Sequence, residues 1–196
     1  MIGSGEKFMP AENVRIRRPM GIRDYFRMYV LYRRSFPACE RKPFAMIRAN
    51  EKRGKTDIWL IEKEGKFLGF ASTVNGEDTI LLDYLAVSRK MRGRGAGSAC
   101  IREMLSVYDG KAFFVEIESI FEQSPDRAAR EKRRGFYLNN GFLPMKVCAS
   151  VFGVEMELLG INCRMSFDEY RDFYKNNYSA YAASNIKKPK FPYAGQ

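Results

Sequence analysis

The spacing of hydrophobic and polar positions changes several times along the chain, and each change marks an expected element. Val14–Pro19 (VRIRRP) alternates like a short strand, and residues 22–36 carry apolar side chains at helical spacing. Pro37 then ends this helix, since proline removes a backbone donor and clashes with the preceding turn. A second helix is expected from about Pro43 to Lys52.

Three strand-like runs follow between residues 56 and 87, with the sequences TDIWLIEK, KFLGFASTV and TILLDYLAV. Their links contain Glu-Gly at 64–65 and Asn-Gly at 75–76, which are typical of tight hairpin turns. This pattern predicts an antiparallel meander. A helix to about Tyr108 and the strand KAFFVEIES come next. The right-handed crossover rule places that strand parallel to the last strand of the meander.

The rest of the chain predicts a helix from about Asp126 to Asn139, strands near 143–149 and 154–160, and a last helix over 167–178. Ser166 and Glu169 have the spacing of a capping box at the start of that last helix. We expect an α/β (α+β) fold with one mixed, mostly antiparallel twisted sheet flanked by helices. Residues 1–162 form the main domain, and residues 163–196 add a C-terminal helix and tail.

The last helix carries aromatic residues on one face. These are Tyr170, Phe173, Tyr174 and Tyr178. Docking of the helix on the domain is the simplest interpretation of this face, and a substrate lid or a dimer contact is the alternative. The segment after the helix, AASNIKKPKFPYAGQ, is expected to be a mobile basic tail.

Composition narrows the possible chemistry. The 196 residues include no histidine, which excludes Ser-His-Asp and Cys-His nucleophile systems and the usual zinc and iron sites. The four cysteines are too widely spaced for a metal site, and we expect three of them to be buried thiols. Apolar runs are too short to span a membrane, and the start lacks a signal-peptide core, which together indicate a cytoplasmic protein. The net charge of +11 attracts polyanions, either nucleic acid or a phosphorylated cofactor.

The segment LAVSRKMRGRGAGSAC, at residues 85–100, has the residue types of an anion site. Gly93, Gly95 and Gly97 lack Cβ atoms, so their backbone amides can approach a ligand closely. The helix that begins here presents unpaired N–H groups and the positive end of its dipole. Arg92 and Arg94 add forked donors that suit phosphate oxygens. A solvated basic turn that caps an ordinary helix is the alternative.

Three phosphate-binding motifs can be compared with this segment. A P-loop requires Gly-Lys-Ser/Thr, but here Ser98 follows Gly97 directly. The dinucleotide fingerprint requires a third glycine where this chain has Ser98 or Cys100. The third motif, Arg/Gln-x-x-Gly-x-Gly/Ala, is matched by Arg92, Gly95 and Gly97.

With this motif placed after a strand that ends at Val87, residues 12–160 resemble the GNAT family of N-acetyltransferases, in element order as well as in sequence. A second signature of the family, Phe/Tyr-Tyr-x-x-x-Gly-Phe, is matched within RRGFYLNNGF, residues 133–142. The chain departs from the family at three positions. Arg89 replaces a common proline, Ala96 replaces a bulky aliphatic residue, and Arg130 replaces a frequent asparagine.

The resemblance implies a GNAT-like sheet and acetyl-CoA, or another acyl-CoA, as the cofactor. The pantetheine arm would pair with the backbone of the last meander strand, and the pyrophosphate would contact amides at the start of the next helix. The cofactor-binding residues implied in this way are Leu85, Ala86, Val87, Arg92, Gly93, Arg94, Gly95, Ala96, Gly97 and Ser98.

The resemblance also implies an acid, a base and an amine acceptor. Tyr137 would protonate the departing CoA thiolate, and a core tyrosine with a satisfied hydroxyl is the alternative. The acceptor must lose a proton, and we expect Glu118, then Asp83, as base or water relay. Glu116 shares a strand face with Glu118, and we expect Glu116 and Glu40 to bind a cationic acceptor. Salt bridges, solvated strand ends and a plain helix–helix turn are the alternatives.

The sequence therefore predicts a cytoplasmic N-acetyltransferase that transfers an acetyl group from acetyl-CoA to a primary amine by direct attack. A GNAT-like regulator that binds acyl-CoA without catalysis is one alternative. A basic nucleic-acid-binding protein is a weaker one, because no helix carries a coherent basic stripe. Dimers are common in the family, so a homodimer is left open, and the identity of the amine is not predicted.

Overall fold

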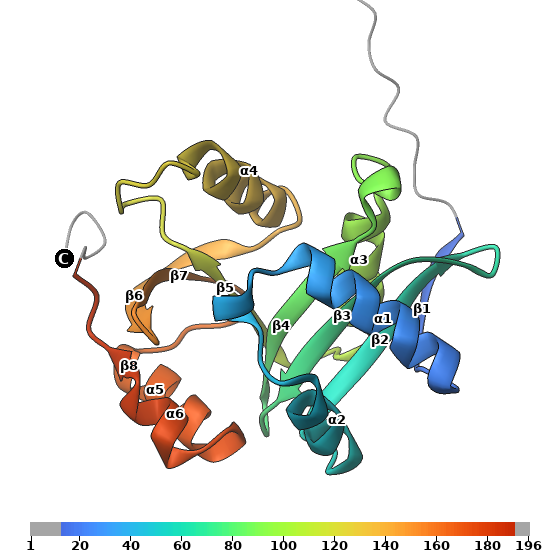
Figure 1. Ribbon diagram of the computed structural model, residues 1–196. Coiled ribbons are helices and arrows are strands. Elements are labelled where there is room, and N and C mark those ends of the chain that lie inside the picture. The colour runs from blue at the N-terminus through green and yellow to red at the C-terminus, as the bar shows by residue number, and fades with distance from the viewer. Residues whose placement is uncertain (1–12, 191–196) are drawn as a thin grey trace, which may run out of the picture.

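The computed structural model describes residues 13–190 and contains one eight-stranded sheet with helices on both faces (Figure 1). The strand order is β1-β2-β3-β4-β5-β7-β6-β8. Only β4 and β5 pair in parallel among the described strands, so the mixed and mostly antiparallel fold class is confirmed. The strands are β1 (Val14–Arg17), β2 (Thr56–Lys63), β3 (Lys66–Asn75), β4 (Thr79–Val87), β5 (Ala112–Glu118), β6 (Leu143–Val151), β7 (Val154–Ile161) and β8 (Ile186–Lys187). The helices are α1 (Ile22–Ser35), α2 (Phe44–Lys52), α3 (Ala96–Val107), α4 (Arg127–Leu138), α5 (Phe167–Asn177) and α6 (Ala180–Ser184).

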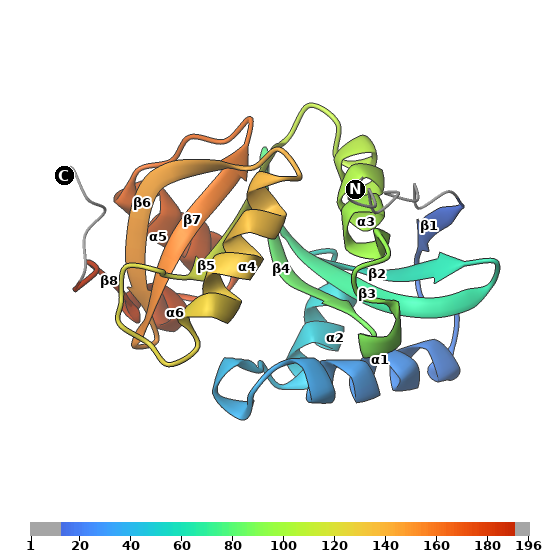
Figure 2. The ribbon, with the colours of Figure 1, turned by 90° about the horizontal axis from the view of Figure 1, so that it is seen from above.

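The helices divide between the two faces of the sheet (Figure 2). Helices α3 and α4 cover one face, where Met104 and Tyr137 pack with Phe113 and other buried strand residues. On the other face, α1 and α2 cover β2–β4, and α5 and α6 cover β4–β7. This alternation follows from the two-residue period of strands, which sends successive side chains to opposite faces.

The elements expected from the spacing of apolar residues are confirmed, including the meander and the parallel pairing of β5 with β4. The turn between β2 and β3 has positive φ at both central residues, 51° at Glu64 and 71° at Gly65. Both conformations are those of a two-residue hairpin turn. The capping box is also present, since Ser166 and Glu169 each accept a hydrogen bond from the other's backbone N–H.

The C-terminal segment differs from the prediction of a mobile tail. Residues 180–184 form α6, and Ile186 and Lys187 form β8, which pairs with Val151 and Ser150 of β6. The few apolar residues of this basic stretch do not follow a helical or strand spacing, so the sequence did not predict an element here. Ala183 and Ile186 are nevertheless buried beside α5. The part of the predicted tail from residue 191 onward lies outside the described residues.

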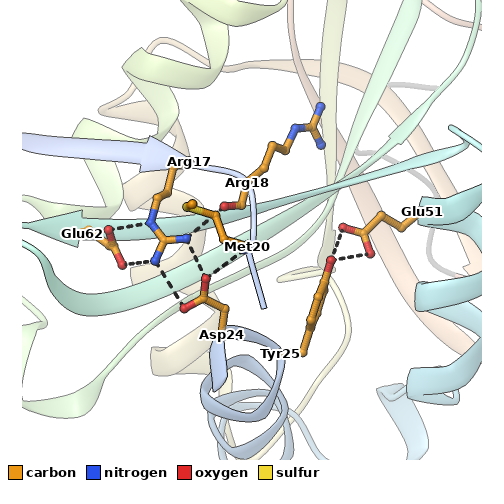
Figure 3. A network of polar contacts seen from close by, with 7 residues as sticks. All are labelled: Arg17, Arg18, Met20, Asp24, Tyr25, Glu51 and Glu62. Atoms are coloured by element: carbon orange, nitrogen blue, oxygen red, sulfur yellow. Dashed lines mark hydrogen bonds and ion pairs between the residues drawn. The ribbon is translucent and has the colours of Figure 1, made fainter. Parts of the chain in front are cut away.

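Arg17 joins three elements at one end of the sheet (Figure 3). Its guanidinium contacts both carboxylate oxygens of Glu62 on β2, at 2.8 and 2.7 Å, and both oxygens of Asp24 on α1, at 2.7 and 3.2 Å. The backbone N–H of Met20 also donates to Asp24 at 3.0 Å. These charge-assisted bonds hold the pKa of the Asp24 carboxyl below its usual value and fasten α1 to the sheet.

Candidate active site

Strands β4 and β5 separate part-way along their length. Their pairing runs from Thr79 opposite Ala112 to Leu82 opposite Val115, and no further. Beyond this point β4 remains paired with β3, and β5 remains paired with β7. Within the described chain, the backbone of residues 83–87 therefore has no strand partner on its β5 side, and Figure 1 shows the two strands diverging.

A bulge lies where the strands separate. The β3–β4 register shifts between Ser72 and Thr73, which pair with Tyr84 and Leu82, so Asp83 is the extra residue. A bulge bends its strand and turns side chains to new directions. As a result, Tyr84 packs beneath α1 and α2, while Leu82 packs with the core beneath α3.

The glycine-rich segment after β4 has the geometry of an anion site. Gly93 and Gly95 have φ of 73° and 77°, which favour glycine, and Gly95 is the N-cap of α3. No side chain caps this end of α3, so the amides of its first turn are free to bind an anion. Arg92 and Arg94 are exposed beside it, and Arg92 Nε donates to the Val87 carbonyl at 3.1 Å.

Gly97 lies close to a neighbouring helix. A Cβ atom at this position would lie 3.1 Å from the ring of Phe136 on α4. That distance is tighter than an ordinary van der Waals contact, so the glycine lets α3 approach α4 closely. Packing between the two helices is sufficient to explain Gly97.

Glu116 lies on β5 just beyond the last β4–β5 pair, and two tyrosines of α5 donate to it. Tyr170 Oη and Tyr174 Oη each lie 2.8 Å from one of its carboxylate oxygens. Burial raises the pKa of Glu116 to about 7, while the positive charge of Lys42 and the two phenols act in the opposite direction. Glu116 can therefore gain and lose a proton near neutral pH.

Asp83 lies opposite Glu116 on β4 and is paired with a lysine from the α1–α2 connection. Lys42 Nζ is 2.6 Å from Asp83 Oδ1 and 2.6 Å from the hydroxyl of Tyr178. The same nitrogen lies 4.1 Å from the centroid of the Tyr178 ring. The negative charge of Asp83 contributes to the raised pKa of Glu116, which places the two carboxylates within electrostatic range of each other.

Glu118 and Glu40 lie at the outer end of the same region. Glu118 is 9% exposed and forms an ion pair with Arg133 of α4. Burial raises the pKa of Glu40, and the positive charge of Arg133 opposes this shift. The structure thus brings Glu40, Asp83, Glu116 and Glu118 to the two diverging strands, with Lys42 and Arg133 as their cationic partners.

The sequence model of the GNAT acetyltransferase family matches residues 25–142. This range includes the diverging strands, the glycine-rich segment and α4. The chain belongs to the GNAT acetyltransferase family. No curated protein matches the chain significantly.

Solved structures of GNAT acetyltransferases share the fold at low sequence identity. A putative GNAT acetyltransferase from Bacteroides thetaiotaomicron is 16% identical, with a TM-score of 0.68 over 86% of this chain and 98% of that one. A ribosomal-protein alanine N-acetyltransferase from Escherichia coli is 16% identical, with a TM-score of 0.58 over 78% and 96%. A dodecameric spermidine N-acetyltransferase from Vibrio cholerae is 9% identical, with a TM-score of 0.57 over 76% and 93%. At these identities the likeness is one of fold.

Tyr137, the expected acid of this GNAT protein, is buried on the inner face of α4. It is 7% exposed and packs against Phe136 and Phe142, with ring centroids 5.1 and 5.3 Å away. Within residues 13–190 its hydroxyl makes no hydrogen bond, and it is not one of the fully buried oxygens that lack a partner there. Burial raises the pKa of Tyr137, so the phenol keeps its proton at neutral pH.

Lys42 and the phenols of α5 were not expected from the sequence in this region. The aromatic face of α5 does dock the helix on the sheet, since Tyr170, Phe173 and Tyr174 are buried there. The hydroxyls of Tyr170 and Tyr174 also reach Glu116, and the hydroxyl of Tyr178, the C-cap of α5, reaches Lys42. The spacing of the tyrosines was sufficient to predict that they share one face of α5. No sequence pattern identified the residues that their hydroxyls contact.

Cys100, Cys148 and Cys163 are unpaired thiols. Burial raises the pKa of Cys148 and of Cys163 to about 11, so neither is a thiolate at neutral pH. No group of residues suited to a metal ion occurs between residues 13 and 190. Over the same range, no helix is long and apolar enough to cross a bilayer.

Proposed function

We propose that this GNAT protein transfers an acetyl group from acetyl-CoA to a primary amine by direct attack. The observation that carries the proposal is the open edge of β4 at residues 83–87, which leads directly to the uncapped N-terminus of α3. An extended amide-containing arm can pair with such an edge, and a pyrophosphate suits a helix start with glycine amides. The two halves of acetyl-CoA would therefore bind β4 and the start of α3.

The cofactor would be held chiefly by backbone groups. The amides at Gly93, Gly95 and Ser98 would receive the pyrophosphate, with Arg92 and Arg94 adding charge beside them. The backbone of residues 85–87 would pair with the pantetheine arm. Arg92 bonds to the Val87 carbonyl in this structure, so its guanidinium is already close to the path of the arm.

Glu116 suits the role of base better than the two carboxylates expected from the sequence. Glu118 is paired with Arg133 and Asp83 with Lys42, so each of these carboxylates already has a cationic partner. Glu116 has a pKa of about 7, near the value that a general base needs at neutral pH. Asp83 and Glu118 would then help to bind the acceptor.

The acceptor is proposed to be a primary amine that enters as an ammonium ion. Glu116 would take its proton, the nitrogen would attack the thioester carbon, and Tyr137 would protonate the departing sulfur. Acidic side chains and tyrosine rings on the acceptor side suit a cation. The free thiols of the chain are consistent with a cytoplasmic location.

Replacement of Gly95 tests the cofactor site. Gly95→Glu places charge and bulk at the N-cap of α3, so we expect its affinity for acetyl-CoA to fall about 10²-fold or more, which is several kcal/mol of charge repulsion. Gly110→Glu is the matched control, because Gly110 also has positive φ, at 78°, and lies at the opposite end of α3. Calorimetric titration measures both affinities. Equal binding by the two folded variants would contradict the assignment.

A further inference from the structure

A primary amine of the chain itself lies where β4 and β5 separate. Lys42 Nζ is 2.6 Å from Asp83, which is the first residue of β4 beyond the pairing with β5. The charge of the same amine also acts on Glu116, the first residue of β5 beyond that pairing. The amine thus contacts one of the diverging strands and lies within electrostatic range of the other.

The loop that carries Lys42 is held in place by tyrosines. Tyr84 Oη accepts from the Lys42 backbone N–H at 3.2 Å and donates to the Glu40 carbonyl at 2.9 Å. Tyr32 Oη donates to the Lys42 carbonyl at 3.0 Å. Tyr178 contacts Nζ at the other end of the side chain, which is 27% exposed. Because both ends of the residue are fixed, the amine has a defined position.

The proposed path of the cofactor ends near this amine. An arm that pairs with β4 from Val87 toward Tyr84 would bring its thioester to Asp83, which is the residue that Lys42 contacts. We propose that Lys42 Nζ is an acetyl acceptor, so that this protein acetylates its own Lys42. The inference rests on the proposed function and adds an acceptor within the chain.

The reaction needs no group beyond acetyl-CoA and the residues of the site. Glu116 takes a proton from the Lys42 ammonium group, and the neutral nitrogen attacks the thioester carbon. The N–C bond forms as the C–S bond breaks, and Tyr137 gives its proton to the departing sulfur. As the amide forms, its nitrogen loses a second proton, which restores Tyr137 through solvent. The products are Nε-acetyl-Lys42, the CoA thiol and one proton, which leaves Glu116 for solvent. No atom is oxidised or reduced.

The test uses the full chain incubated with acetyl-CoA and no added amine, followed by peptide mass spectrometry over time. Lys55 serves as the background lysine, because it is exposed and its Nζ lies 3.5 Å from the Asn176 carbonyl, away from the diverging strands. We expect Lys42 to be acetylated faster than Lys55. Tyr137→Phe should slow acetylation of Lys42 by about 10²-fold and leave Lys55 unchanged, since only a site reaction needs the acid.

A matched pair of variants locates the modification in intact protein. The acetyl mass gained by wild-type protein should disappear in Lys42→Arg, which keeps the charge beside Asp83, and persist in Lys55→Arg. Lys42 that stays unmodified, or that reacts at the Lys55 rate in wild type and Tyr137→Phe alike, would overturn the inference. If acetyl-CoA still binds and an external amine is acetylated in that case, the proposed function stands. If acetyl-CoA does not bind at all, both proposals fail.

Discussion

Glu116 is the residue whose protonation should set the pH dependence of the reaction. Burial raises its pKa to about 7, and a base works only when it is ionised. We therefore expect kcat for amine acetylation to rise as the pH increases through about 7 and to level off above it. Steady-state rates over a pH series measure this, and Glu116→Gln should lower kcat about 10²-fold and remove the inflection.

Tyr174 provides the control for that inflection. Its hydroxyl donates to the Glu116 carboxylate and so stabilises the ionised form. Tyr174→Phe should move the inflection to higher pH, whereas Tyr181→Phe, at an exposed position of α6, should leave it unchanged. An inflection at the same pH in both variants would exclude Glu116 as the group that titrates.

Tyr137 should act on the chemical step and not on cofactor binding. Removal of its hydroxyl in Tyr137→Phe leaves the ring packing against Phe136 and Phe142 intact, so the affinity for acetyl-CoA should stay the same. We expect kcat to fall by about 10²–10⁴-fold, which is the usual contribution of a positioned acid. Thiol release and calorimetric titration give the two quantities. Tyr29→Phe, on the surface of α1, is the control, and a rate equal to that control would rule out the acid role.

The backbone conformation of single residues was predictable where a motif fixes it. Gly95 was found because an N-cap in the left-handed region favours glycine, and its φ is 77°. The close approach of Gly97 to Phe136 could not be predicted, because Phe136 lies far along the sequence. The ion-pair partner of Glu118 could likewise not be predicted from the sequence, because Arg133 belongs to a separate helix.

At the scale of elements, hydrophobic spacing located the strands but not the point where two of them separate. The run TILLDYLAV reads as one strand, and the structure keeps it as one, β4. The bulge at Asp83 and the end of the β4–β5 ladder depend on which residues of β5 and β7 pair, and no local pattern contains that information. The separation of the two strands therefore depends on the pairing of the sheet as a whole.

Arg17 is the residue whose contacts between elements should contribute most clearly to the free energy of unfolding. Arg17→Met should lower the free energy of unfolding by about 2 kcal/mol, because charge-assisted bonds to Glu62 and Asp24 are lost. Arg15→Met, at an exposed position of the same strand, should change it by no more than about 0.5 kcal/mol. Urea denaturation measures both values, and similar losses in the two variants would show that the network contributes little.

The effect of Arg17→Met should also depend on pH. Arg17 holds the pKa of Asp24 below its usual value, so the Asp24 contribution to stability is present above the unfolded pKa of about 3.9 and is lost as the pH falls through the lower folded value. The difference between Arg17→Met and wild type should therefore shrink in acid below about pH 4. A difference that stayed constant in acid would mean that packing of the Arg17 side chain, and not its charge, is responsible.

At the scale of the molecule, the family match ends at residue 142, but the sheet does not. Strands β6, β7 and β8 complete it, and α5 supplies the tyrosines that contact Glu116 and Lys42. The order of helices and strands along the chain could be predicted, because apolar residues recur at different spacings in helices and in strands. That α5 contributes both to the core and to the candidate site could not be predicted, because this depends on contacts between residues more than 50 positions apart.

The net charge of +11 raises a question for the whole molecule, since such a surface attracts nucleic acid as well as a phosphorylated cofactor. Acetyl-CoA at about 100 times its Kd should add about 2.7 kcal/mol of stability, provided that it binds only the folded chain. For a chain of 196 residues this corresponds to a rise in Tm of roughly 5–10 °C, measurable by thermal unfolding. The Gly95→Glu variant should show no such rise.

The salt dependence of binding distinguishes acetyl-CoA from nucleic acid as the anion that the protein binds. Binding that depends on many phosphate contacts weakens by about 10³–10⁵-fold between about 50 and 200 mM salt. Binding to the open edge of β4 and the α3 N-terminus relies on backbone hydrogen bonds and few charges, so most of the acetyl-CoA shift should survive at the higher salt. No shift at either salt would contradict the cofactor assignment. Salt-sensitive retention on nucleic acid would then identify the basic surface, and not the diverging strands, as the functional region.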